Sequence, residues 1–223
     1  MNKLKYLATL MIAIAGFGLQ QAKAFESDLS AGNSAISGFT GPYAHLSITL
    51  VNSTTATVTF TSLTNSGNIY LLGDGGSVAL NVNAASFSVS GISGTNSGTG
   101  FTPGPFTQQA GGNEDGFGAF NLRISSFDGF THSSDSITFT LTNLSGTWAT
   151  QADVVTANAA GFDAAAHIFV TSFPANASNS ALATGFAAEP GHGPPGVPDG
   201  GATVMLLGAA LGALGMVRRY LKS

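Results

Sequence analysis

Apolar and polar residues alternate along the middle of the chain. Every second residue is apolar in six segments, at residues 46–50, 58–60, 78–82, 87–89, 120–124 and 137–141. A period of two over such short stretches is typical of β-strands with one buried face. Clusters of Asn, Gly, Ser and Asp separate these segments and mark turns, for example at 73–76. The pattern therefore predicts an all-β domain of about seven to nine strands, an antiparallel β-sandwich or jelly roll.

The predicted domain covers residues 25–173. Its final strand is predicted at 165–170, because the run His167-Ile168-Phe169-Val170 favours extended backbone. Residues 94–115 are rich in Gly, Ser, Thr and Pro and predict a long ordered loop. Residues 174–196 consist mostly of small residues with Pro and Gly, so a flexible linker is predicted there.

The first 24 residues have the three parts of a secretory signal peptide. Lys3 and Lys5 supply a positive start, and an apolar run covers residues 6–19. Ala22 and Ala24 supply the small residues of a cleavage site, so the mature chain is predicted to begin at Phe25. The secretion translocon and signal peptidase are the expected partners. The alternative is an N-terminal anchor that is not cleaved.

The other end of the chain has the pattern of a short membrane-spanning helix. Residues 201–217 carry no charge, and as a helix they would extend about 25 Å, within the range for a membrane span. Arg218, Arg219 and Lys222 follow and form a basic stop. The positive-inside rule places this end in the cytoplasm and the domain outside. The alternative is a buried core helix, which the Pro- and Gly-rich flank at 190–200 argues against.

A short motif precedes the predicted helix and consists of Val197, Pro198, Asp199, Gly200 and Gly201. Motif, helix and basic stop together resemble the PEP-CTERM class of sorting signals, most closely its V-P-D-S-G variant, with Gly200 in place of Ser. The resemblance covers residues 197–223. It implies recognition by an exosortase, a membrane-embedded transpeptidase-like enzyme, with cleavage near the motif and transfer from the inner membrane to the cell surface or an extracellular matrix.

The middle of the domain is also similar to a group of uncharacterised PEP-CTERM proteins. The segments that carry this resemblance are residues 70–74, 112–118, 127–132 and 161–170. The resemblance implies no activity.

The distribution of charge restricts the partners of the domain. The chain has seven Lys and Arg residues against eleven Asp and Glu residues, a formal net charge of −4. Arg123 is the only basic residue between Phe25 and Gly196. Phosphate recognition needs clustered Lys or Arg, so nucleic acid is not expected as a partner. The chain has no cysteine, which excludes disulfides, thiolate metal sites and cysteine nucleophiles.

Oxygen-bearing side chains gather near glycines at Asn113, Glu114, Asp115 and Asp128. This composition suits a calcium loop, although the spacing does not match an EF-hand. The alternative is a set of solvated turns, since Asn, Asp and Gly are turn residues. Calcium is the one cofactor that the sequence suggests.

Catalytic constellations are harder to find. Glu114 or Asp115 with Asp128 or Asp163 would be the carboxylate pair of a glycosidase, but nothing in the sequence fixes their separation. The histidines lack the spacing of a metal motif, and no G-x-S-x-G elbow is present. His167 is interpreted as a strand residue with a satisfied hydrogen bond.

Three functions remain open at this point. The first is a non-catalytic envelope or matrix protein, displayed and processed by an exosortase-type system. The second is a carbohydrate-binding or adhesive module, with an extracellular polysaccharide as partner and Tyr43, Tyr70 and Trp148 as candidates for a stacking platform; core packing is the alternative role of these aromatic residues. The third is a secreted hydrolase.

Overall fold

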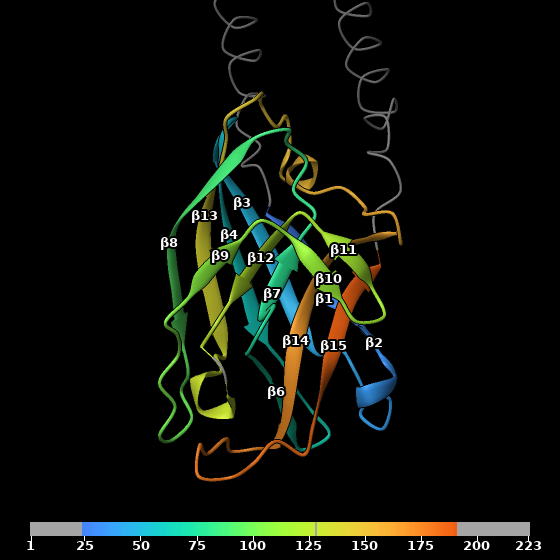
Figure 1. The fold of residues 1–223 in the computed structure, drawn as a ribbon, viewed down its shortest axis with the longest axis vertical. Helices are drawn as coiled ribbons and strands as arrows, with labels where there is room; N and C mark the ends of the chain where they lie inside the picture. The colour runs from blue at the N-terminus through green and yellow to red at the C-terminus, as the bar shows by residue number, and fades with distance from the viewer. Residues whose placement is uncertain (1–23, 128, 191–223) are drawn as a thin grey trace, which may run out of the picture.

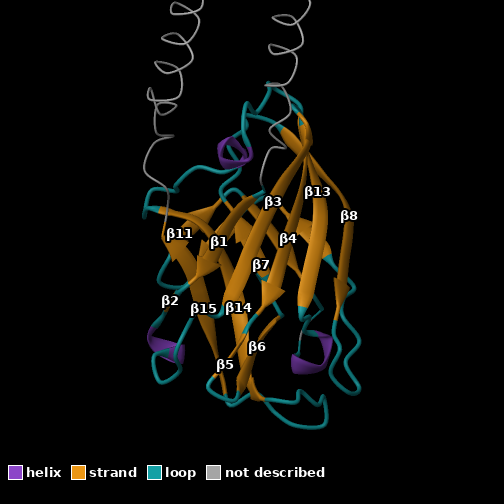
Figure 2. Cartoon of the chain, turned by 180° about the vertical axis from the view of Figure 1, so that it is seen from behind, coloured by secondary structure: helices purple, strands orange, loops and turns teal. Residues whose placement is uncertain are grey.

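The computed structural model describes residues 24–127 and 129–190, which form two antiparallel β-sheets packed face to face (Figures 1 and 2). Sheet A has five strands in the order β1-β3-β4-β13-β8. Their bounds are β1 Phe25–Leu29, β3 Ala44–Asn52, β4 Thr55–Ser62, β13 Ser136–Asn143 and β8 Phe87–Thr95. The prediction of an all-β, antiparallel fold is confirmed.

Sheet B has eight strands, with a main path β2-β15-β14-β7-β12-β9. The bounds on this path are β2 Ala31–Gly32, β15 Ala183–Pro190, β14 Phe162–Ser172, β7 Val78–Leu80, β12 Leu122–Ser125 and β9 Thr107–Gln109. The other two strands of sheet B are β6 Asn68–Leu72, which pairs with β14, and β5 Thr64–Asn65. A separate hairpin joins β10 Gly112–Glu114 to β11 Gly118–Phe120, and the short 3-10 helices are η1 Ser34–Ile36, η2 Phe130–His132 and η3 Gln151–Val154.

The core lies between the two sheets and takes alternate residues from the longer strands. Phe60 and Phe139 of sheet A are fully buried in it, together with Ile168 and Val170 of sheet B. Most of the apolar positions that the alternation predicts as buried are buried, which confirms the predicted inner faces. Each large side chain removed from water in this way contributes roughly 1.5–3 kcal/mol of transfer free energy, so this core needs no crosslink.

The outer face of sheet B is covered by further structure. The β10–β11 hairpin lies over β14 and β15 (Figure 1) and buries Phe117 and Phe120 against Ala165 and Ala188. A second cluster on this face surrounds Phe169. The middle of sheet B around β14 is therefore buried on both faces, while the outer face of sheet A is a row of half-buried and exposed side chains.

The predicted strand over 120–124 is two strands. The side chain of Asn121 interrupts it, because its amide accepts a hydrogen bond from the Val82 backbone N–H (2.7 Å) and donates one to the Val82 carbonyl (2.8 Å). The side chain thus takes the place of a backbone pairing partner. Phe120 consequently faces the outer cluster, while Leu122 faces the core.

The prediction of a flexible linker over 174–196 is wrong for residues 183–190. These residues form β15, which pairs with β14 along eight positions and with β2 at two. Ala187 and Ala188 are fully buried. Small side chains resemble a linker in sequence, but here they let β15 lie under the hairpin. The domain therefore extends beyond residue 173 to at least Pro190, and β14 is its penultimate strand rather than its last.

The predicted signal peptide, apart from Ala24, and the predicted membrane helix over 201–217 lie outside the described residues. Across residues 24–127 and 129–190, the structure contains no helix that is long and apolar enough to cross a membrane.

Candidate functional site

Three of the four residues predicted as calcium ligands, Asn113, Glu114 and Asp115, occupy the β10–β11 hairpin, and their side chains do not converge on one site. Asn113 is exposed, Glu114 is fully buried, and Asp115 is exposed in the turn. The Asp115 carboxylate accepts a hydrogen bond from the amide of Asn33 at 3.1 Å, whereas Glu114 points inward. Asp128 lies outside the described residues. Within the described part of the chain, no group of three or more His, Asp or Glu side chains is arranged to hold a metal.

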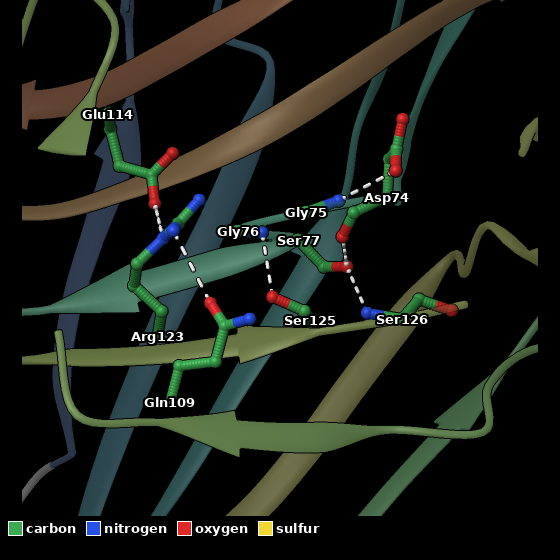
Figure 3. Close-up of polar contacts among 9 residues, drawn as sticks. All are labelled: Asp74, Gly75, Gly76, Ser77, Gln109, Glu114, Arg123, Ser125 and Ser126. Carbon is green, nitrogen blue, oxygen red and sulfur yellow. Dashed lines mark hydrogen bonds and ion pairs between the residues drawn. The ribbon is translucent and has the colours of Figure 1, made fainter. Parts of the chain in front are cut away.

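Glu114 instead forms an ion pair with Arg123 of β12. The Nε of Arg123 donates to the Oε1 of Glu114 at 2.6 Å, and its Nη1 donates to the Oε1 of Gln109 at 3.3 Å (Figure 3). Arg123 is the only Lys or Arg in the described residues, so this pair fixes the hairpin to sheet B with the one basic side chain available.

Two glycines allow this pair to form. Gly76 has φ +70°, and a Cβ there would lie 2.7 Å from the Glu114 Oε2 and 2.6 Å from the Arg123 Nη2. At Gly112, φ is +159° and a Cβ would lie 2.6 Å from the Arg123 Nη1. Only a residue without a side chain fits at either position. Gly112, one of the glycines beside the predicted calcium ligands, therefore serves to admit an arginine.

Burial raises the pKa of Glu114 from 4.5 to about 7, although the charge and hydrogen bond of Arg123 both favour the carboxylate. The Oε2 of Glu114 has no hydrogen-bond partner, which is costly for a buried carboxylate. The ion pair thus positions the hairpin at the expense of stability near neutral pH.

The predicted turn at 73–76 is confirmed and is tied to the end of β12. Asp74 has φ +63°, and its carboxylate accepts from the Gly75 N–H at 2.8 Å. The Ser77 hydroxyl donates to the Asp74 carbonyl at 2.7 Å and accepts from the Ser126 N–H at 2.9 Å (Figure 3). The Gly76 N–H donates to the Ser125 hydroxyl at 2.9 Å. These groups satisfy one another and form a structural network.

His167 lies beside this network on the outer face of sheet B. Its ring stacks on Phe186 at a centroid distance of 4.4 Å and on Phe169 at 5.3 Å. Its Nε2 lies 2.7 Å from the Thr184 hydroxyl. This confirms the interpretation of His167 as a strand residue with a hydrogen-bond partner. Burial lowers its pKa and outweighs the opposing charge of Asp74, so the ring is held in its neutral form.

A second polar cluster lies on β1 and β3 and was not predicted from the sequence. The two ring nitrogens of His45 face two carboxylates, with Nδ1 2.7 Å from Asp28 and Nε2 2.5 Å from Glu26. Ser47 donates to the other oxygen of Glu26 at 3.0 Å. Neutral histidine has one N–H, so two such contacts require the charged ring. The pKa of His45 is raised: burial lowers it, but the hydrogen bonds and charges of the two carboxylates raise it by more.

The remaining candidates for chemistry are placed as follows. Asp163 is only 1% exposed, at a bulge where β14 begins, and Glu114 is fully buried. Neither carboxylate is therefore open to a polymeric substrate in this conformation. Tyr43, Tyr70 and Trp148 are core residues, at 4%, 0% and 2% exposure, so these three form no stacking platform.

The described part of the molecule is thus an all-β domain with one buried ion pair, Glu114–Arg123, and one partly exposed cluster of His45 with Glu26 and Asp28. Residues 196–221, which follow the domain, match the family model described as the VPDSG-CTERM motif. The match contains the predicted motif at 197–201 with Arg218 and Arg219, and it shows a sorting-signal tail of the PEP-CTERM kind. No curated protein and no solved structure matches the chain.

Removing one member of the Glu114–Arg123 pair is expected to cost more than removing both. Arg123→Met leaves a buried carboxylate without its counter-charge and should lower the free energy of unfolding by about 3–5 kcal/mol at pH 8. The penalty should shrink at pH 5, where Glu114 is protonated. The double variant Glu114→Met/Arg123→Met should lose much less. Urea denaturation at both pH values measures this, and equal losses in the two variants would contradict it.

Stability should also depend on the charge of His45. Its pKa is higher in the folded than in the unfolded state, so its contribution is fully present below pH 6.5 and is lost as the pH rises through the folded value. Because the cluster is partly exposed, we expect less than about 1 kcal/mol. Compared with His45→Gln, the wild type should lose stability as the pH rises above 6.5. Ser47→Ala, which leaves the titrating groups in place, should retain the wild-type slope, and parallel curves for wild type and His45→Gln would refute the role of His45.

Proposed function

We propose that this chain is a non-catalytic protein of the cell envelope or extracellular matrix, displayed and processed through an exosortase-type sorting system. The observation that carries the proposal is the sorting motif at residues 196–221. That motif is the tail of an exported protein, consistent with an envelope or cell-surface location. In the proposal, the tail anchors the chain in the inner membrane only until cleavage near Val197–Gly201 frees the domain.

The structure of the domain supports this reading. β15 ends at Pro190, so six residues lie in the sequence between this strand and Val197. Pro198 and Gly200 are residues that disfavour a helix, as expected for a sequence that a processing enzyme reads. The acidic side chains with the deepest burial take part in internal contacts rather than in an open catalytic cleft.

The sorting motif should determine the mature C-terminus. Intact-mass analysis of the protein from its native cell surface should give a C-terminus at or before Gly201. Pro198→Ala/Asp199→Ala should retain the tail, because the processing enzyme reads these positions. Pro194→Ala/Pro195→Ala, just outside the matched residues, should be processed like the wild type. A surface protein that still ends at Ser223 would contradict the proposal and indicate a permanent anchor.

A further inference from the structure

Most outward side chains of sheet A carry a hydroxyl group. On β4, β13 and β8 every outward residue that alternates with the core is Ser or Thr, and β3 adds two more. We call this set the hydroxyl face, and it consists of Ser47, Thr49, Thr55, Thr57, Thr59, Thr61, Ser88, Ser90, Ser93, Thr95, Ser136, Thr138, Thr140 and Thr142. Figure 2 shows the four strands side by side.

The strand register aligns these hydroxyls in rows. One row runs across four strands through Ser47, Thr59, Thr138 and Ser93, and its central pair lies 3.0 Å apart, oxygen to oxygen. The next row consists of Thr49, Thr57, Thr140 and Ser90. Neighbouring strands are about 4.8 Å apart, and outward residues repeat about every 6.8 Å along a strand. The face is thus a regular array of groups that both donate and accept hydrogen bonds.

The array is uncharged. Neither Lys, Arg, Asp nor Glu occurs on β4, β13 or β8, and the charged groups on the strands of this sheet lie on β1 and β3, in Glu26, Asp28 and His45. Edge strands commonly carry charged side chains, especially Lys, and β8, the edge strand beside β13, has none. The two carboxylates on β1 are already bound by His45 and Ser47. The strands β4, β13 and β8 therefore offer no charged group to an ionic polymer, and a neutral polymer can lie on them without burying an unpaired charge.

The face is also not apolar. The exposed large apolar side chains among the described residues all lie off β4, β13 and β8, at Val51, Phe127, Leu144, Phe173 and Leu182. A protein partner that docks through an apolar patch finds none on these strands. Chemical complementarity therefore favours a partner that is neutral and rich in hydroxyls.

We propose that the hydroxyl face binds a neutral polysaccharide. The proposal rests on the surface display proposed above and names the class of partner that the displayed domain meets. No aromatic platform is involved, so each sugar contributes weakly, and the strength comes from many hydrogen bonds along one polymer chain. β15, which leads to the sorting tail, belongs to the opposite sheet, so attachment through the tail leaves this face open.

An ice surface is the other partner whose hydrogen-bonding groups could match a regular array of hydroxyls. The twist of a β-sheet disfavours it. Neighbouring strands of a sheet rotate by roughly 20–25° relative to one another, so rows on four strands do not remain in one plane. A flexible polymer can follow a twisted row, whereas a crystal plane cannot.

Native affinity electrophoresis of the full-length protein tests the proposal. The gels contain dextran, galactomannan or mixed-linkage β-glucan as neutral probes, and alginate as an anionic probe. Retardation is expected in at least one neutral gel and not in alginate. Thr57→Val/Thr140→Val keeps the shape of both side chains and should weaken the apparent affinity about tenfold. Thr57→Ser/Thr140→Ser should bind like the wild type.

The control variant is Thr107→Val, on the exposed strand β9 of sheet B, which should bind like the wild type. Melting temperatures of all variants verify folding. Absence of retardation in every neutral gel, or equal binding by the Val pair and the wild type, would overturn the proposal. So would inhibition of ice recrystallisation without retardation. The two proposals can fail separately. Glycan binding by a protein that keeps Ser223 would refute the proposed processing and leave the polysaccharide proposal standing. A processed protein that binds no glycan would refute the polysaccharide proposal and leave the processing standing.

Discussion

The packing of sheet A on sheet B is the interaction on which the rest of the structure depends. The chain has no disulfide, and its described residues hold one Arg–Glu ion pair, so stability comes mainly from apolar side chains between the sheets. Because strand side chains alternate, each buried residue forces its neighbours outward. The residues that line the outer faces are therefore fixed by those that line the core. The outer face of sheet B is covered by further structure, and that of sheet A is open.

Sheet B covers its outer face with a hairpin and loops, and the Glu114–Arg123 pair lies beneath this cover. Buried pairs of this kind contribute little net stability compared with apolar packing. The pair instead positions β10 over β14. The space that its side chains occupy is free only because residues 76 and 112 are glycines. Sheet A leaves its outer face open and lines it with hydroxyls, which keep the face soluble without charge.

The sequence was informative where structure is local. Alternation at 46–50, 58–60 and 137–141 predicted the strands and their inner faces, because the period of two is visible within each segment. It failed where a distant residue decides the outcome. The Ala residues of β15 resemble a linker in sequence, because only their pairing with β14 gives them a structural role. Glu114 resembles a solvated turn residue in sequence, because its partner Arg123 lies on another strand and is not adjacent in the chain. Gly76 and Gly112 can be identified from the sequence, but their contact with the Arg123 side chain cannot. The sorting tail is a linear motif, and the family match to it agrees with the prediction from sequence alone.

The central claim is that this domain is displayed outside the cell with the hydroxyl face open and its alternate residues buried. Since the chain has no cysteine, a single introduced cysteine reports its own surroundings. Thr140→Cys on intact cells should react with a membrane-impermeant maleimide. Leu141→Cys, one residue away and fully buried, should react only after denaturation. Labelling of Thr140→Cys that requires lysis, or equal labelling of both positions on intact cells, would contradict the account.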